Sequence, residues 1–371
     1  MLQRLYVNNF RCLVNFELKT KEMPSSLIIG KNGAGKSTIA DALEIFQRVG
    51  RGIHRVGQIV QEKDFAFNRS EAPMRFEIEV LLSGKLYHYI LALELPETFH
   101  ELRVFEEALS VAGDTVFSRK QAQVTVPKNS QSGMEAAKFF VDWHLVALPV
   151  IQERSEKDPL HIFKTWLAHT IILAPIPRLI TGVSSGETLE PKRDGSNLGE
   201  WLSGLLGQFP AAYMEISRYL SEMMPDLSEY RNDPIGKDAK CMNVFFGDKS
   251  ANFSVSFEDL SDGEKCFFLC AVVLAANKAY GPLFCFWDEP DNFLSLSEVG
   301  HFTQELRRVF QNGGQLIVSS HNDEAIRKFS NENTWILDRK SHLEPTLIKL
   351  LEEVQLHGDL IEALICDDLR L

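Results

Sequence analysis

Several features that mark other protein classes are scarce or missing in these 371 residues. No apolar run approaches the length of a membrane span, and the N-terminus lacks the charged, apolar and small-residue segments of a signal sequence. The six cysteines are scattered, without a CxxC pair or a histidine at metal-ligand spacing. These absences argue against a membrane-spanning, secreted or zinc-dependent protein. We expect reduced thiols in a cytoplasmic protein that makes no membrane contact.

Basic residues are also in short supply, since 39 Lys and Arg stand against 51 Asp and Glu and leave a formal net charge of −12. A protein that grips duplex DNA usually has a basic footprint, which is missing here. One local group, Arg48, Arg51, His54 and Arg55, reads either as a solvated helix end or as a DNA-facing surface. No sustained heptads occur, so we expect no long coiled-coil arm.

The most informative segment that is present is residues 30–37, which read GKNGAGKS. It follows the apolar run 27–29 and precedes a helix-like stretch, 39–46, which is the context of a phosphate loop. Glycines let backbone N–H groups converge on a phosphate, and the helix N-terminus adds its positive end. Lys36 is expected to reach the β- and γ-phosphates of ATP, and the Ser37 hydroxyl to hold Mg²⁺. The predicted nucleotide-binding residues of this loop are Gly30, Lys31, Asn32, Gly33, Ala34, Gly35, Lys36, Ser37 and Thr38.

Two apolar runs near the C-terminus end in residues suited to ATP hydrolysis. Residues 283–287 read as a buried parallel strand, and Asp288 and Glu289 follow it directly. Ligands of open α/β sheets bind at such strand ends, so we assign Asp288 to the Mg²⁺ shell and Glu289 to the general base. A second apolar strand, 315–319, leads to His321, which can sense or stabilise the γ-phosphate.

The segment LSDGE, residues 260–264, precedes an apolar helix expected at 266–276. Ser261 as N-cap and Glu264 three residues on form the pattern of an ordinary capping box. The same segment also has the form of an ABC-type signature, in which Ser261, Gly263 and Glu264 belong to the nucleotide site. Both interpretations are compatible, because a helix N-terminus is itself an anion site.

The chain contains four motifs in this order: the phosphate loop, the LSDGE signature, the acid pair and the switch histidine. This order resembles that of the ABC-type ATPase heads of the RecF, SMC and OLD proteins. Residues 194–198 (DGSNL) and 288–294 (DEPDNFL) are similar to stand-alone bacterial predicted AAA ATPases grouped with the OLD type. The resemblance implies a head-to-tail homodimer with two shared ATP sites. In it, His321 contacts the γ-phosphate in cis, and Ser261 and Gly263 reach it in trans.

The opening residues 5–13 resemble the first strand of RecF-like heads, whose arginine in the N-F-R turn lies near the nucleotide. Arg11 takes that role by resemblance, although a surface arginine between two strands is an equal alternative. In this family, a glutamine after the first helix connects the nucleotide to the inserted lobe, and here it is either Gln58 or Gln61. Transporter-like heads have Leu-Asp after the acid pair, and this aspartate is assigned to coupling between subunits. This chain has Leu294-Ser295 there, and Asp291 is the residue we consider as a substitute for that aspartate.

These features predict an α/β P-loop NTPase of ABC-ATPase type, with an antiparallel β region and an inserted helical lobe. We expect the N-terminal half of the head at 1–119, a mainly helical lobe at 120–235 and the C-terminal half at 236–371. Alternation predicts strands at 74–82, 87–95, 107–111 and 116–119, and helices are expected at 135–148, 196–206 and 211–224.

Three functions fit this reading. The first is an ATP-driven switch that controls a separate effector protein, for example a nuclease, in anti-phage defence. The second is a RecF-like clamp that binds DNA in repair, and the third is a transporter energy subunit, for which no coupling surface is identifiable. OLD-type nuclease residues are not expected here, because Asp367 and Asp368 at the C-terminal end lack the surrounding motif.

Overall fold

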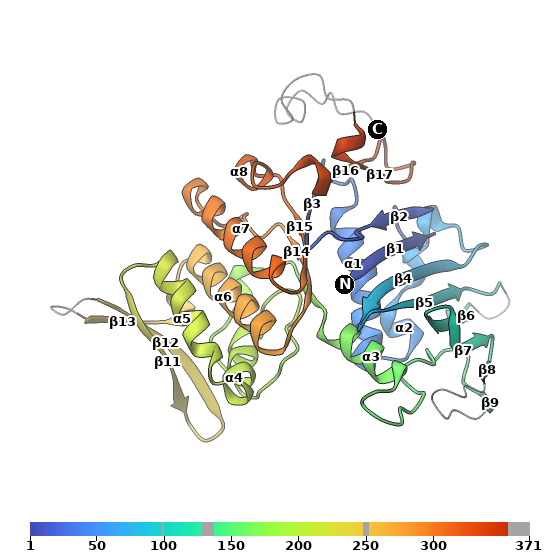
Figure 1. Cartoon of the computed structure of the whole chain (residues 1–371), viewed down its shortest axis with the longest axis horizontal. Helices are drawn as coiled ribbons and strands as arrows, with labels where there is room; N and C mark the ends of the chain where they lie inside the picture. The colour runs from blue at the N-terminus through green and yellow to red at the C-terminus, as the bar shows by residue number, and fades with distance from the viewer. Residues whose placement is uncertain (98–99, 128–136, 248–251, 355–371) are drawn as a thin grey trace. The chain divides into compact units, whose positions relative to one another are not determined.

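The computed structural model describes residues 1–97, 100–127, 137–247 and 252–354. Its contacts divide the chain into two compact units (Figure 1). The first unit contains residues 1–23, 29–170 and 334–371, and the second contains residues 24–28 and 171–333. The predicted α/β class with an antiparallel β region is confirmed.

The first unit is built on an eight-stranded sheet in the order β2-β1-β4-β5-β6-β7-β8-β9, with every neighbouring pair antiparallel. The expected hairpins of residues 74–95 and 107–119 are confirmed. The sheet packs on α1 and α3 through aromatic side chains, such as Phe46 against Phe76 and Tyr87 stacked on Phe163. The strands are β1 (Leu2–Asn8), β2 (Phe16–Lys19), β4 (Met74–Leu82), β5 (Lys85–Glu94), β6 (Arg103–Val111), β7 (Asp114–Lys120), β8 (Gln123–Val126) and β9 (Ala137–Phe140), and the helices are α1 (Lys36–Gly50) and α3 (Pro159–His169).

The second unit contains a parallel sheet whose strands follow the order β10-β14-β15-β3. β14 (Phe284–Asp288) and β15 (Gln315–Ser319) are buried at every position, as the continuous apolar runs predicted. β10 (Ile171–Leu173) flanks β14, and β3 (Ser25–Gly30) flanks β15. The helices of this unit are α4 (Leu198–Gln208), α5 (Ala212–Met223), α6 (Asp262–Tyr280), α7 (Leu296–Gln311) and α8 (Asp323–Ile326).

A three-stranded antiparallel sheet completes the second unit, with β11 (Leu227–Ile235), β12 (Ala239–Gly247) and β13 (Asn252–Ser256) in that order. It extends beside α5 in Figure 1. Tyr230 of β11 stacks on Tyr213 of α5 and meets Phe268 of α6 edge-on. These contacts bury one face of the sheet against the helix pair.

The remaining elements lie mostly in the first unit. α2 (Val56–Ile59) follows α1, and the strands β16 (Thr334–Asp338) and β17 (Leu347–Leu350) pair antiparallel. The connection between β16 and β17 ends at Thr346. Within the described residues, no helix has both the length and the apolar character that crossing a membrane requires.

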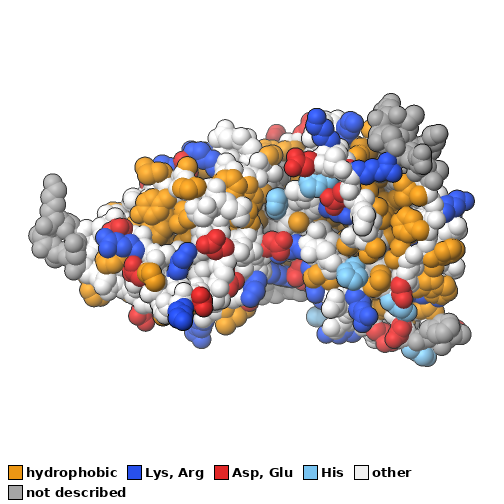
Figure 2. Space-filling view, turned by 90° about the horizontal axis from the view of Figure 1, so that it is seen from below, with side chains coloured by type: hydrophobic (Ala, Val, Ile, Leu, Met, Phe, Trp, Pro, Cys, Tyr) orange, Lys and Arg blue, Asp and Glu red, His pale blue; other side chains and the backbone are white. Residues whose placement is uncertain are grey.

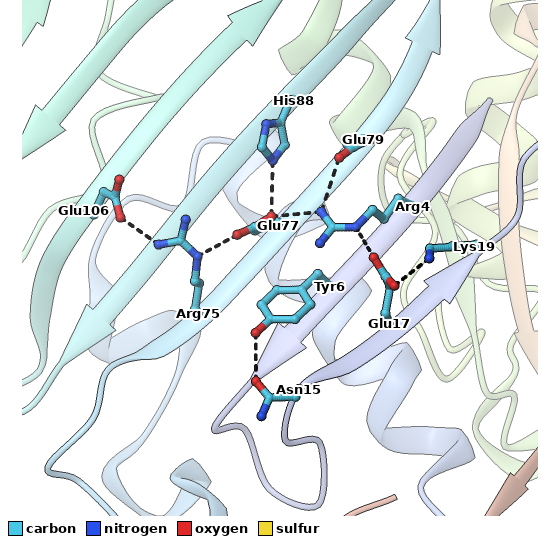
Figure 3. A network of polar contacts seen from close by, with 10 residues as sticks. All are labelled: Arg4, Tyr6, Asn15, Glu17, Lys19, Arg75, Glu77, Glu79, His88 and Glu106. Carbon is cyan, nitrogen blue, oxygen red and sulfur yellow. Dashed lines mark hydrogen bonds and ion pairs between the residues drawn. The ribbon is translucent and has the colours of Figure 1, made fainter. Parts of the chain in front are cut away.

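The outer face of the eight-stranded sheet carries a connected network of charged side chains (Figure 3). Glu77 lies at its centre, and hydrogen bonds from His88, Arg4 and Arg75 hold the pKa of this carboxyl well below its usual value. Because acids and bases alternate here, the face forms a self-compensated polar surface. Its other members are Tyr6, Asn15, Glu17, Lys19, Glu79 and Glu106.

The helix expected at 135–148 is wrong: residues 137–140 form β9, where Phe139 pairs with Val124 of β8. Consecutive bulky residues fit the rim of a sheet better than a helix that has no apolar stripe. The expected lobe 120–235 is divided by the contacts, since 120–170 belong to the first unit and 171–235 to the second. That residues 120–235 form a separate inserted lobe stays a prediction. Asp367 and Asp368 lie outside the described residues.

Candidate nucleotide-binding site

The phosphate loop connects the end of β3, at Gly30, to the start of α1, at Lys36. Gly33 and Gly35 adopt φ values of 80° and 110°, which side chains with a Cβ rarely tolerate. A Cβ on Gly35 would also lie 2.8 Å from Thr346 Oγ1 and 2.9 Å from Cys12 Sγ. The glycines of the motif are therefore required by the local backbone.

Lys36 lies inside this loop. Its side chain is buried, and its Nζ donates to the carbonyl oxygens of Gly30 at 2.9 Å and Lys31 at 3.4 Å. Ser37 is exposed at the first turn of α1, whereas the Thr38 hydroxyl lies 3.6 Å from the Cys12 thiol. The loop therefore combines the Lys36 ammonium with the N-terminus of α1. Both carry positive charge, so the arrangement suits a polyphosphate.

Arg11 lies in a tight turn after β1 and has a positive φ of 51°. Its guanidinium donates to Asp41 of α1 and, from Nε at 2.9 Å, to Asp64 Oδ1. The side chain is 42% exposed, so these two carboxylates orient it without enclosing it. Arg11 thus belongs to the same cluster as the helix that follows the phosphate loop.

Gln61 is connected to this cluster, whereas Gln58 has no such connection among the contacts of the described chain. The Asp64 carboxylate accepts from the backbone N–H of Gln61 at 2.9 Å through Oδ2, while Oδ1 accepts from Arg11. Gln58 lies exposed in α2. Of the two candidates, Gln61 is the one linked to Arg11, through the Asp64 carboxylate that both contact.

In the second unit, Asp288 is the last residue of β14 and Glu289 follows it, so the acid pair lies at the strand end that the sequence predicted. The Ser319 hydroxyl, on the neighbouring strand β15, donates to Asp288 Oδ1. Glu289 has a positive φ of 50°, and its N–H lies 3.1 Å from both the carbonyl oxygen and the hydroxyl of Ser319. A strained backbone held by a neighbouring strand is a common feature of functional sites.

The Glu289 carboxylate is held by two further side chains. His321 Nε2 lies 2.6 Å from Oε1, and Asn292 Nδ2 donates to Oε2 at 2.7 Å. Both Glu289 and His321 remain partly exposed. The structure thus brings the predicted base and the predicted switch histidine into direct contact, and it adds Asn292, which sequence reasoning did not single out.

Asp291 differs from these exposed side chains, because it is buried and accepts from Ser320 Oγ at 2.8 Å. Burial raises the pKa of this carboxyl above its usual value, and the Ser320 hydrogen bond opposes that rise. Its other oxygen, Oδ1, has no hydrogen-bond partner within the described part of the chain. Asp291 therefore stabilises the turn after the acid pair and does not present its carboxylate at the surface.

The signature segment forms a complete capping box at the start of α6. Ser261 Oγ accepts from the Glu264 N–H at 3.3 Å, and Glu264 Oε2 accepts from the Ser261 N–H at 2.8 Å. A Cβ on Gly263 would lie 3.1 Å from the carbonyl oxygen of Phe293, in the turn after the acid pair. The capping interpretation is confirmed, and the trans role of this segment stays a prediction.

The candidate residues fall into one cluster in each unit. The loop 30–38 and Arg11 lie in the first unit, whereas Asp288, Glu289, His321 and the signature segment lie in the second. Across the described ranges, no group of three or more His, Cys, Asp or Glu residues is arranged to hold a metal ion. The Ser37 hydroxyl and the Asp288 carboxylate are oxygen donors of the type that Mg²⁺ prefers, and Mg²⁺ commonly takes its other ligands from water and phosphates.

A phosphate loop, an acid pair at a parallel strand end and a capped LSDGE helix together define a P-loop nucleotide-binding protein of the ABC-ATPase class. The sequence model described as "RecF/RecN/SMC N terminal domain" matches residues 1–342. The chain belongs to this family, which confirms the resemblance to RecF and SMC heads.

Solved structures show the same fold. One is described as "SmcHead bound to the C-winged helix domain of ScpA"; it has a TM-score of 0.56 and 16% identity, and covers 95% of this chain and 99% of that one. Another is an Smc head domain with an extended coiled coil, bound to the C-terminal domain of ScpA, derived from Pyrococcus furiosus. It has a TM-score of 0.50 and 13% identity, and covers 95% and 97% of the two chains. Comparison with curated proteins gave no match.

Proposed function

We propose that this protein binds Mg²⁺-ATP and hydrolyses it at two shared sites of a head-to-tail homodimer. The observation that carries the proposal is the phosphate loop, with Lys36 Nζ 2.9 Å from the Gly30 carbonyl and two glycines at positive φ. Membership of the RecF/RecN/SMC family supports ATP as the nucleotide. In this arrangement, Lys36 leaves the loop carbonyls to pair with the β- and γ-phosphates, because the ammonium attracts a negatively charged phosphate oxygen more strongly than a neutral carbonyl oxygen.

We assign the hydrolytic step to Glu289, which takes a proton from the attacking water as general base. His321 lies 2.6 Å from Glu289 Oε1 and orients this carboxylate while contacting the γ-phosphate in cis. Ser37 and Asp288 would hold Mg²⁺, which when bound neutralises charge on the β- and γ-phosphates. Ser261 and Gly263 of the partner subunit complete the site in trans, at the N-terminus of α6.

The proposed role of this cycle is a nucleotide switch: ATP closes the dimer, which recruits or restrains a separate effector protein, for example in anti-phage defence. Similar structures support a protein partner, since their descriptions name an Smc head bound to a domain of ScpA.

A DNA-binding clamp is the second candidate, and the group at Arg48, Arg51, His54 and Arg55 is its basis. Arg51 Nε donates to the Ala168 carbonyl at 3.2 Å, so this guanidinium helps to hold α3. On the face shown in Figure 2, Lys and Arg side chains are interspersed with Asp and Glu. Neither observation favours an extended DNA-binding surface, and the switch remains our first proposal.

Purified variants test the ATPase proposal. Lys36→Ala should abolish ATP binding measured by calorimetry, whereas Lys85→Ala, at an exposed lysine that begins β5, should retain it. Glu289→Gln should bind ATP normally, hydrolyse it at least about 100-fold more slowly and accumulate as a dimer in light scattering. Tight ATP binding by Lys36→Ala would remove the phosphate-loop assignment, and normal turnover by Glu289→Gln would remove the base.

The shared site has its own test. Ser261→Arg should still bind ATP but neither dimerise nor turn over, whereas Ser261→Thr, which keeps the capping hydroxyl, should do both. To find the effector, Glu289→Gln is isolated from its native cells in Mg²⁺-ATP and in nucleotide-free buffer. A stoichiometric protein retained only with ATP supports the switch. Duplex DNA without a protein moves the clamp to first place.

A further inference from the structure

The back of the phosphate loop rests on a residue that lies 312 positions further along the chain. Thr346 is buried, and its Oγ1 donates to the carbonyl oxygen of Ala34 at 2.7 Å. Its backbone N–H separately donates to the Cys12 carbonyl at 2.9 Å. Thr346 therefore joins the end of the β16–β17 connection to the loop by its side chain and to the turn after β1 by its backbone.

The hydrogen bond to Ala34 fixes the orientation of one peptide plane of the loop. In a trans peptide, the carbonyl oxygen of one residue and the N–H of the next point in opposite directions. The Ala34 carbonyl faces Thr346 behind the loop, so the N–H of Gly35 faces the other side. An N–H on that side is the kind of donor that a phosphate loop presents to its ligand.

The packing around Gly35 shows how close this support is. A Cβ at Gly35 would lie 2.8 Å from Thr346 Oγ1 and 2.9 Å from Cys12 Sγ. Thr346 therefore stands directly against the backbone that it orients. A side chain at position 35 has no room toward this residue, so only glycine lets the backbone lie this close to the Thr346 hydroxyl.

We propose that Thr346 is a positioning residue for nucleotide binding: its hydroxyl holds the Ala34–Gly35 peptide so that the Gly35 N–H faces the bound phosphate. The inference rests on the proposed ATP binding and adds to it a residue outside the phosphate-loop motif. Because the Thr346 N–H is held by Cys12 independently, removal of the hydroxyl leaves the end of the connection in place.

The test replaces Thr346 by Val, which keeps the shape and removes the donor, and by Ser, which restores the donor. Loss of one neutral hydrogen bond predicts about three- to tenfold weaker ATP binding for Thr346→Val. Turnover at saturating ATP should stay near the wild-type rate, because the lost contact is made equally in the ground state and in the transition state. Thr346→Ser should recover wild-type affinity.

Thr20→Val is the matched control, because Thr20 is also buried and its Oγ1 donates to a backbone carbonyl, that of Leu2, at 3.0 Å. It should lower the melting temperature without weakening ATP binding. Thr346→Ala is a second truncation in case the valine variant does not fold. The inference is overturned if Thr346→Val or Thr346→Ala binds ATP like the wild type, or if Thr20→Val weakens binding equally. If the wild type itself binds no ATP, the proposed function fails first.

Discussion

The phosphate loop and the acid-pair region are held in place by different kinds of contact. In the loop, the deciding atoms belong mostly to the backbone: the positive φ of Gly35, the Ala34 carbonyl and the carbonyls that Lys36 contacts. Around the acid pair, side chains hold side chains, as Ser319 holds Asp288 and His321 holds Glu289. The two regions therefore respond to substitution in different ways.

The phosphate loop is held mainly by backbone atoms, so it tolerates few added side-chain atoms. An extra Cβ or a lost carbonyl contact changes the direction of several N–H groups together, so we expect large effects from small residues. A side-chain-built region depends on hydroxyl and carboxyl groups that act one at a time. Single deletions there should give graded losses, because each removes one hydrogen bond while the strand beneath keeps its register.

The largest effect expected in this comparison is that of Gly35→Ala. Alanine at φ 110° is strained, and its Cβ would collide with Thr346 and Cys12, so ATP affinity should fall about 100-fold or more. Gly33→Ala meets no atom within 4 Å, and strain alone should weaken binding only about fivefold. Calorimetric titration with ATP measures both.

The pair of glycine variants separates two causes. If Gly33→Ala and Gly35→Ala weaken ATP binding equally, backbone strain decides the effect and the packing behind Gly35 does not. A melting temperature near that of the wild type in both variants would show that the loss is confined to the loop.

A medium effect is expected from Ser319→Ala. The Ser319 hydroxyl contacts both Asp288 and the N–H of Glu289, so its removal leaves both acidic residues less firmly placed. Turnover at saturating ATP should fall about tenfold, with ATP affinity within about twofold of the wild type. Ser320→Ala is the matched control, because its hydroxyl bonds to Asp291 and to the N–H of Asn322, whereas the Ser319 hydroxyl is the one that bonds to Asp288 and Glu289. Equal turnover losses in the two variants would contradict the assignment.

The same contrast explains what the sequence could predict. The glycine spacing of the loop and the apolar runs of β14 and β15 are local patterns, so the positions of the motifs followed directly from them. The ABC-type fold class followed from the resemblance of the motif order to RecF and SMC heads. Strand alternation likewise gave β4 and β5. Local pattern failed for β9, where a short strand at the rim of a sheet is defined by its pairing with β8.

Side-chain partners were the harder part of the candidate site. Ser319 and Ser320 lie inside or beside an apolar run, and nothing in their spacing shows that they hold Asp288 and Asp291. Thr346 carries no signal either, because its contact with Ala34 depends on a fold that brings residues 312 positions apart together. Such contacts arise only when tertiary structure forms.

The smallest effect is expected at Asp291, the buried carboxyl group near the acid pair. Burial raises the folded-state pKa of Asp291, with Glu289 adding to the rise while Ser320 and His321 oppose it. The folded protein therefore holds this proton more tightly than the unfolded chain, whose Asp pKa is about 3.9. Stability contributed by the protonated group is present below that unfolded value and is lost as pH rises through the folded-state pKa.

Asp291→Asn removes this titration, so the melting temperature of the variant relative to wild type should increase as the pH is raised from about 4, by a few degrees at most. Ser320→Ala in the wild-type background should strengthen the dependence, because the lost hydrogen bond is one that lowers the pKa of Asp291. A melting-temperature difference that stays constant from acidic to neutral pH would mean that Asp291 titrates alike in both states. The effects of substitutions around the acid pair would then come from the loss of hydrogen bonds alone, without a contribution from the burial of Asp291.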